Sequence, residues 1–192
     1  MAKILVFDNY DSFTYNLVHY VRIAGGHEVD VALNDEIPLQ DIGPYDGIIL
    51  SPGPGVPSEA GMLKPLIDYY KSSKRIFGVC LGQQAIAEVF GGTLINLTTV
   101  YHGVATPVSF STPRHYLFEG LPETIEAGRY HSWAVDPGTF PSCLRIDATD
   151  QNGQIMALSH REFDICSVQF HPESILTPTG INIITNWLKG FN

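Results

Sequence analysis

Short apolar runs recur along the first 80 residues of the chain, separated by polar and turn-forming segments. The runs are KILVFD (3–8), EVDVAL (28–33), DGIILS (46–51) and RIFGVC (75–80). Runs of this length, rich in β-branched and other apolar residues, predict β-strands, and the second also alternates between polar and apolar positions.

Helical periodicity lies between these runs. Residues 12–26 carry apolar side chains at helical spacing, with Asp11 as the expected N-cap and Gly25-Gly26 as the stop. The expected apolar face comprises Phe13, Leu17, Tyr20, Val21 and Ala24. Segments 59–73 and 83–90 predict two further helices, although Pro65 disturbs the first. This order of strands and helices predicts an α/β fold with a central, mostly parallel sheet and helices on both faces.

From residue 93 onward the pattern changes to short β-like pieces. These lie at 93–97, 105–110, 124–130, 143–149, 155–160 and 164–170. Thr177 and Pro178 are then suited to begin a last helix. The expected apolar face of this helix is Ile181, Ile184, Trp187 and Leu188. Because no repeat, low-complexity tract or linker interrupts the pattern, we expect residues 1–192 to form a single domain.

The net charge and the number of cysteines exclude several classes of protein. A net charge of −9 argues against nucleic acid or an anionic membrane surface as the main partner. No apolar run approaches the ~20 residues that cross a bilayer, and the first residues lack a signal-peptide layout. Cys80, Cys143 and Cys166 are too few and too scattered for a disulfide framework or a zinc site. We therefore expect a reduced, cytoplasmic protein with no metal and no cofactor.

Cys80 occupies a position suited to a nucleophile. In GVCLGQQ (78–84) it lies between a predicted strand and a predicted helix, with a glycine two residues away on each side. In a sharp strand-to-helix turn, larger side chains there would clash. The N-terminus of the next helix favours a thiolate, and the N–H of Leu81 points where an oxyanion would form. Taken alone, the motif fits a buried structural cysteine equally well.

A nucleophile needs a base, and the base needs an orienting group. In QFHPES, His171 and Glu173 lie two residues apart in an extended segment, which places them on one side, and Pro172 restrains the backbone. Glu173 can accept a hydrogen bond from one imidazole nitrogen while the other faces Cys80. The pair alone also fits a strand-end turn. A zinc deaminase is excluded, because no Pro-Cys-x-x-Cys follows.

SPGPG (51–55) follows a predicted parallel strand, at the sheet edge where α/β proteins bind ligands. Gly53 and Gly55 could direct backbone N–H groups at a carbonyl oxygen or a carboxylate, although such clusters are often plain turns. His131 in RYHSW has no acidic partner nearby in sequence and is interpreted as structural. A flavin-binding module is a weaker alternative, because the loop after the first strand has no glycine and its aspartates would repel phosphate.

Together these motifs resemble the class I (triad-type) glutamine amidotransferases over essentially the whole chain. The resemblance is carried by GVCLGQQ, SPGPGVPSEAG, YHS and QFHPES. DNYDSFTYNL is similar to the small subunits that serve chorismate-using synthases, for anthranilate or for 4-amino-4-deoxychorismate, and GVPSEAG is closer to the anthranilate type. The implied fold is a mixed sheet between helices, in a flavodoxin-like arrangement.

The resemblance also implies residue roles. Cys80 would attack the side-chain amide of L-glutamine, His171 would move the proton, and Glu173 would orient His171. Gly55 and Leu81 match oxyanion-hole positions. The implied glutamine-binding positions are Gly53, Pro54, Gly55, Gln84, Ser132 and Trp133. The ammonia would pass to a larger chorismate-binding synthase subunit, docked near residues 8–16 and 101–104, because the chain carries no second catalytic cluster.

Two positions depart from the family pattern. Gln83 stands where many relatives have histidine, and Val104 replaces a lysine in YHGVATPV, which leaves contacts that depend on that lysine open. Three alternatives remain. The subunit could serve 4-amino-4-deoxychorismate synthase; a stand-alone γ-glutamyl cysteine hydrolase would turn over without a partner; a non-catalytic binding module would keep its function without Cys80.

Overall fold

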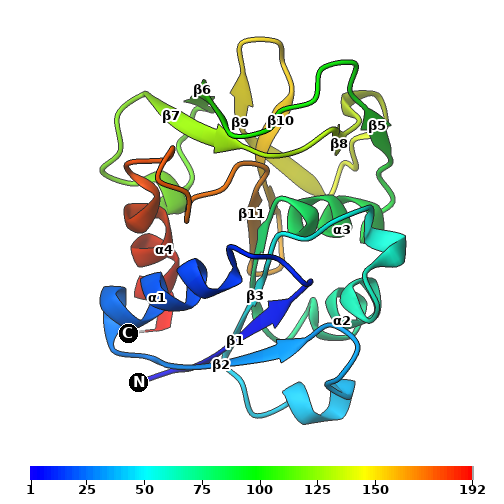
Figure 1. The fold of residues 1–192 in the computed structure, drawn as a ribbon, viewed down its shortest axis with the longest axis vertical. Helices are drawn as coiled ribbons and strands as arrows, with labels where there is room; N and C mark the ends of the chain where they lie inside the picture. Colours follow the sequence, from blue (N-terminus) through cyan, green and yellow to red (C-terminus); the bar gives the residue numbers. More distant parts are fainter. Residues whose placement is uncertain (192) are drawn as a thin grey trace.

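The computed structural model describes residues 1–191; Asn192 lies outside this description. Within these residues a mixed sheet of nine strands forms the centre, in the order β2-β1-β3-β4-β11-β10-β9-β6-β7 (Figure 1). Neighbours are parallel from β2 to β11 and antiparallel from β11 to β7. The expected mixed α/β fold is confirmed, with the parallel strands gathered on one side of the sheet.

The elements follow the predicted order in the first half of the chain. The strands of the large sheet are β1 (Lys3–Asp8), β2 (Glu28–Leu33), β3 (Gly47–Leu50), β4 (Arg75–Val79), β6 (Val104–Phe110), β7 (Thr124–Arg129), β9 (Leu144–Asp150), β10 (Ile155–His160) and β11 (Ile165–Val168). A separate pair consists of β5 (Leu94–Asn96) and β8 (Trp133–Val135). The helices are α1 (Thr14–Gly25), α2 (Leu63–Tyr70), α3 (Leu81–Val89) and α4 (Gly180–Leu188).

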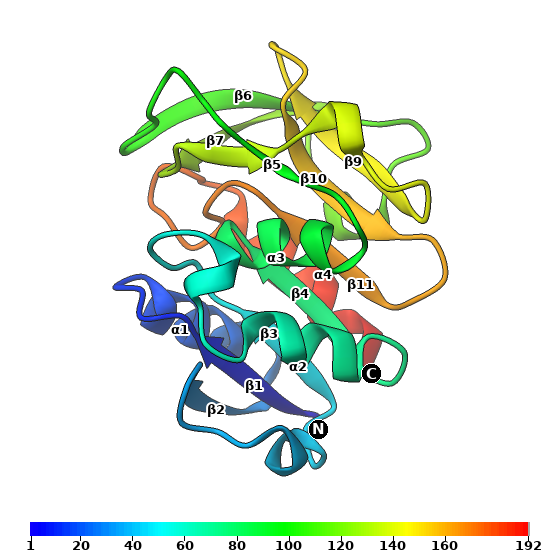
Figure 2. The ribbon, with the colours of Figure 1, turned by 90° about the vertical axis from the view of Figure 1, so that its right-hand side faces the viewer.

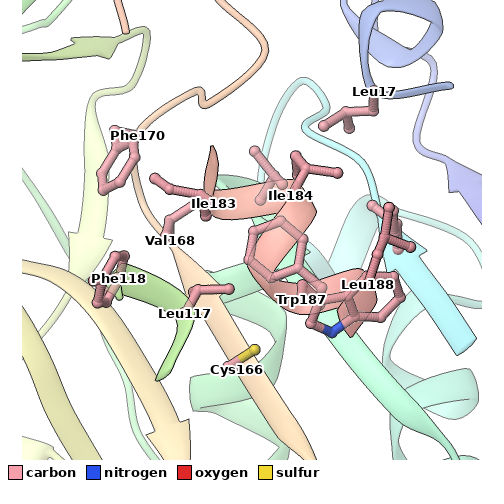
Figure 3. Close-up of a cluster of buried hydrophobic side chains, with 14 of the residues drawn as sticks. Leu17, Leu117, Phe118, Cys166, Val168, Phe170, Ile183, Ile184, Trp187 and Leu188 are labelled. Carbon is pink, nitrogen blue, oxygen red and sulfur yellow. The ribbon is translucent and has the colours of Figure 1, made fainter. Parts of the chain in front are cut away.

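Helices cover both faces of the parallel strands. In Figures 1 and 2, α1 and α4 lie together on one face and α2 and α3 on the other. Each pair closes its own buried cluster against the sheet. Figure 3 shows Ile183, Ile184 and Trp187 of α4 beside Val168 of β11 in the first cluster. β1, β3 and β4 are buried on both faces and have continuous apolar runs, which explains why they can be predicted. The less buried edge strand β2 alternates between polar and apolar residues instead.

The predicted start of α1 is wrong. The helix begins at Thr14, after Phe13, and no side chain of residues 1–191 caps it. The Asp11 carboxylate instead accepts a hydrogen bond from the Phe13 N–H, at 2.8 Å. Asp8 accepts one from the Thr14 hydroxyl, at 2.7 Å. Asp11 therefore orders the loop before the helix, and Asp8 ties the first residue of the helix to the end of β1.

The predicted start of α4 is also wrong, since the helix begins at Gly180 and not at Pro178. The Thr177 hydroxyl donates to the His171 carbonyl, at 2.7 Å, and accepts from the Gly128 N–H, at 2.9 Å. These bonds hold Thr177 against the strands, so it cannot cap a helix. In addition, α2 is shorter than the predicted 59–73, and β8 has no counterpart among the predicted strands.

The parallel strands converge on one edge of the sheet. β1, β3, β4 and β11 are neighbours and parallel, so their carboxyl ends lie side by side. The segments that leave these ends are 9–13, 51–55, 80–81 and 169–173. This is the edge at which open α/β sheets bind ligands. None of the helices in residues 1–191 is long and apolar enough to cross a membrane.

Candidate active site

Cys80 sits in a sharp turn between β4 and α3. Its backbone has φ 52° and ψ −99°, a conformation that residues with a side chain rarely adopt. A Cβ on Gly78 would lie 2.8 Å from the backbone carbon of Gly82, and a Cβ on Gly82 would lie 2.9 Å from the Cβ of Leu50. Both glycines are therefore needed for the close approach of α3 to the sheet.

His171 and Glu173 form a buried pair directly after β11. The Nδ1–H of His171 donates to Oε1 of Glu173, at 2.7 Å, and both side chains are shielded from solvent. Burial alone would lower the pKa of His171, but the Glu173 carboxylate and the Cys80 side chain outweigh it and raise that pKa well above its usual value. The Nε2 atom makes no hydrogen bond within residues 1–191. A base and its nucleophile often align fully only when substrate binds.

The raised pKa of His171 predicts a pH-dependent contribution to stability. A group whose folded-state pKa is raised stabilises the fold fully below its unfolded value, about 6.5 for histidine, and loses this effect as pH rises through the folded value. Glu173→Gln should therefore lower the free energy of unfolding most at about pH 6 and less as pH rises. Urea unfolding of both chains across pH measures this difference. A difference that grows with pH would contradict the ion pair.

Aromatic rings from distant segments enclose His171. The Tyr130 ring lies 4.9 Å from the imidazole and the Phe13 ring 5.7 Å, both edge-on. Asn16 at the start of α1 donates to the Glu173 carbonyl, at 3.5 Å. Burial raises the pKa of Asp11, while the hydrogen bond from the Phe13 N–H and, to a smaller extent, the His171 charge partly offset this effect. The loop after β1 thus packs against the His–Glu pair, a contact that the sequence does not predict.

A small polar pocket opens beside Cys80. Its volume is about 150 Å³. It is lined by Gly53, Pro54, Gly55, Cys80, Leu81, Gln84, Tyr130, His131, Ser132 and Trp133. Every predicted oxyanion and glutamine-binding position thus lies around one cavity. His171 and Glu173 stand next to Cys80 rather than in the pocket wall, and Tyr130 and His131 are additional wall residues.

The turn at 51–55 is held in place by Asn9, a buried residue of the loop after β1. Its backbone N–H donates to Ser51 Oγ and its side-chain Nδ2 donates to the Ser51 carbonyl, both at 2.8 Å. A Cβ on Gly53 would lie 2.6 Å from the Cβ of Asn9 and 2.8 Å from Leu81 Cδ2. Gly55 has φ 69°, a left-handed conformation that glycine adopts without strain. The turn therefore depends on both glycines.

The N–H of Leu81 is placed to bind a ligand. Leu81 is the first residue of α3, and the first N–H groups of a helix have no partner within the helix. The positive end of the helix dipole adds to this preference for a developing negative charge. Gly55 and Leu81 line the same pocket as Cys80. The start of α3 therefore faces the pocket that Cys80 also lines.

His131 holds the backbone of the pocket wall in place. Its Nδ1–H donates to the Trp133 carbonyl, at 2.8 Å, and its Nε2 accepts from Arg129, at 3.1 Å. Burial, with the Arg129 charge, lowers the pKa of His131 to about 4, so the ring is neutral at physiological pH. Arg129 is itself buried and paired with Asp150, at 2.7 Å. These contacts stabilise the wall of the pocket at Trp133.

Gln169, which the sequence analysis does not single out, touches the thiol. Its Nε2 donates to Sγ of Cys80, at 3.4 Å, and its Oε1 accepts from Gln84, at 3.2 Å. The sequence does contain a signal that could have found Gln169. It lies two residues before His171, just as Glu173 lies two residues after His171. The same alternation that groups His171 with Glu173 also includes Gln169.

The departures from the family pattern lie away from the pocket. Gln83 is a buried residue of α3; its side chain donates to the Ile155 carbonyl, at 3.2 Å, and accepts from the Ser167 hydroxyl, at 3.3 Å. Val104 is exposed at the start of β6.

Burial raises the pKa of Cys166 to about 12, which marks an unreactive thiol. Within residues 1–191, no group of three or more His, Cys, Asp or Glu side chains is arranged to hold a metal ion.

Cys80 in its sharp turn and the buried His171–Glu173 pair lie beside one small polar pocket. The family model for glutamine amidotransferase class-I matches residues 5–191. The chain belongs to the class-I glutamine amidotransferase family.

Particular relatives are similar over almost their full lengths. Anthranilate synthase component 2 of Azospirillum brasilense is 46% identical, covering 97% of this chain and 95% of the relative. Aminodeoxychorismate synthase component 2 of Klebsiella aerogenes is 44% identical, covering 97% and 99%. Aminodeoxychorismate/anthranilate synthase component 2 of Bacillus subtilis is 42% identical, covering 98% and 96%.

Solved structures have the same fold. The crystal structure of a putative GMP synthase protein from Thermoplasma acidophilum superposes with a TM-score of 0.88 at 28% identity. The alignment covers 98% of this chain and 93% of that one. The arrangement of sheet and helices is therefore shared well beyond the synthase components named above.

Proposed function

We propose that this chain is the glutaminase subunit of a chorismate-using synthase, anthranilate synthase in the first place. The observation that carries the proposal is Cys80 in the wall of a small pocket, next to the buried His171–Glu173 pair, with Gly55 and Leu81 lining the same pocket. The substrate, L-glutamine, follows from membership of the amidotransferase family. Its partner follows from the names of the relatives, which serve anthranilate or aminodeoxychorismate synthase.

In the first half of the reaction, His171 takes the proton of the Cys80 thiol, and the Sγ thiolate attacks the side-chain amide carbon of glutamine. The C=O electron pair moves to oxygen, and the N–H groups of Gly55 and Leu81 stabilise the oxyanion. His171 then donates a proton to the amide nitrogen as the C–N bond breaks, so that ammonia leaves. The product is a γ-glutamyl thioester on Cys80.

In the second half, water replaces the sulfur. His171, now neutral, accepts a proton from water as its oxygen attacks the thioester carbon. The C–S bond breaks, the electron pair returns to sulfur, and glutamate leaves. Glu173 keeps the Nδ1–H of His171 occupied, at 2.7 Å, so that Nε2 is the atom that exchanges protons in both halves.

The choice of synthase is tested by pairing the chain with each larger subunit. The chain would be mixed separately with the purified larger subunit of anthranilate synthase and with that of aminodeoxychorismate synthase, each time with chorismate and glutamine. We expect glutamine-dependent anthranilate formation with the first. Product only with the second would move the assignment to aminodeoxychorismate synthase, which the 44% identity to the Klebsiella protein favours as the second candidate. Full glutamine hydrolysis without either larger subunit would instead indicate a stand-alone hydrolase.

The face around the pocket carries exposed apolar side chains suited to a partner. Ile175, two residues after Glu173, is 92% exposed, and Tyr15 at the start of α1 is 68% exposed. The hydrogen bond from Asn16 to the Glu173 carbonyl brings these two segments together. Asp8 is unsuited to dock a partner, because it is buried and bonded to Thr14. We therefore assign the docking face to the exposed apolar residues Ile175 and Tyr15, the second of which lies in the expected segment 8–16.

Ile175→Asp should weaken binding of the larger subunit by at least about tenfold, because burying isoleucine contributes about 1.5–3 kcal/mol and a buried carboxylate is costly. Ile23→Asp, at the far end of α1 and also exposed, is the matched control and should leave the affinity unchanged. Titration calorimetry with the larger subunit measures both. Equal affinities for the two variants would remove Ile175 from the interface.

A further inference from the structure

Gln169 is a fully buried side chain placed between the nucleophile and the pocket wall. It follows β11 directly, and its backbone N–H donates to the Met156 carbonyl, at 2.9 Å. Its amide makes two side-chain hydrogen bonds, to Cys80 Sγ at 3.4 Å and from Gln84 at 3.2 Å. Both ends of the amide are therefore held, and one end contacts the reacting sulfur.

The direction of these hydrogen bonds follows from the backbone at Trp133. A carbonyl oxygen only accepts, so Gln84 must present its NH₂ group to the Trp133 carbonyl, at 2.9 Å. The same NH₂ group donates to Oε1 of Gln169. Because Oε1 faces Gln84, the NH₂ group of Gln169 faces Cys80. The result is a one-way series of donors that begins at the pocket wall and ends at the sulfur.

We propose that Gln169 is a catalytic residue that donates a hydrogen bond to Sγ of Cys80 and stabilises its thiolate form, with Gln84 as the positioning residue. A thiolate is a stronger acceptor than a thiol or a thioester, so the donor favours the charged sulfur. This matters before attack, and again when the C–S bond breaks and the electron pair returns to sulfur. The assignment rests on the proposed function, since it requires Cys80 to be the nucleophile.

A purely structural role for Gln169 predicts something different. A buried amide that only fills space would affect folding stability, or the shape of the glutamine pocket through Gln84, and hence KM. A donor to the sulfur affects kcat and the intrinsic reactivity of Cys80, even toward a reagent that is unrelated to glutamine. The two roles therefore separate in a measurement of thiol alkylation against pH.

The test uses Gln169→Leu, which removes the donor, and Gln169→Glu, which keeps the size and the acceptor for Gln84. In both variants we expect the midpoint of the pH profile for Cys80 alkylation by iodoacetamide, followed by mass spectrometry, to rise by about one unit. We expect kcat for glutamine hydrolysis in the synthase complex to fall by about 10- to 100-fold, with KM changed less than about threefold. Circular dichroism confirms that each variant is folded.

Gln83→Leu is the matched control, because Gln83 is also a buried glutamine but bonds to Ile155 and Ser167. Its alkylation profile should equal that of the unmodified chain. If both Gln169 variants keep the original profile and kcat, or if only KM rises, the catalytic role is wrong. A Cys80→Ala chain that keeps full turnover would overturn the proposed function as well. Loss of turnover in Cys80→Ala without any effect at Gln169 would overturn the role of Gln169 alone.

Discussion

Replacing Cys80 with alanine is expected to lower glutamine-dependent turnover by at least about 10³-fold, because the covalent route is then closed. The strained turn presents this side chain: Cys80 has φ 52°, and Gly78 and Gly82 leave room for nothing larger. Alanine keeps the backbone and removes only the sulfur. Glutamate release from the complex, measured by a coupled assay, reports the loss.

Two controls separate a lost nucleophile from a damaged protein. The Cys80→Ala complex should still form product when free ammonia replaces glutamine, because the proposed function places the synthase chemistry in the larger subunit. Cys143→Ala should leave turnover unchanged, since Cys143 lies between β8 and β9, away from the pocket. Glutamine-dependent turnover that survives in Cys80→Ala would show that the cysteine is a structural thiol.

Replacing His171 with alanine is expected to cost a similar factor, at least about 10³-fold, because in the proposed mechanism both proton transfers pass through its imidazole. Glu173→Ala should cost less, since it orients the base and does not touch the substrate. If Cys80 and His171 act as one unit, as proposed, the double variant should be little worse than either single one. Steady-state kinetics of the four chains in the complex measure this. Additive losses would show that the two residues act independently.

Most of the sheet can be predicted from sequence, because strands buried on both faces need continuous apolar runs. The short strand β8 cannot, since its three residues pair only with β5 and have no periodicity of their own. The predicted starts of α1 and α4 are wrong for a different reason, because the side chains expected to cap these helices form other hydrogen bonds. Thr177 has the chemistry of a cap, but its hydroxyl bonds to His171 and Gly128, which lie elsewhere in the fold.

The site shows the same division between local and tertiary information. Cys80, His171 and Glu173 can be proposed because their chemistry and spacing are visible along the chain. The packing of Phe13 and Tyr130 against His171 depends on how distant segments meet, and no local pattern encodes it. A neutral amide such as Gln169 has no distinctive reactivity, so only the structure, through its contact with sulfur, draws attention to it.

The most direct test of the central claim is mass-spectrometric mapping of the chain after exposure to a diazo-ketone analogue of glutamine. The labelling would be carried out with the larger synthase subunit present, with and without excess glutamine. A single adduct on Cys80 that glutamine prevents is the result we predict, and it would establish nucleophile and substrate together. Equal labelling of Cys143 and Cys166, or no adduct on Cys80 in the complex, would contradict the assignment of Cys80 as the glutaminase nucleophile.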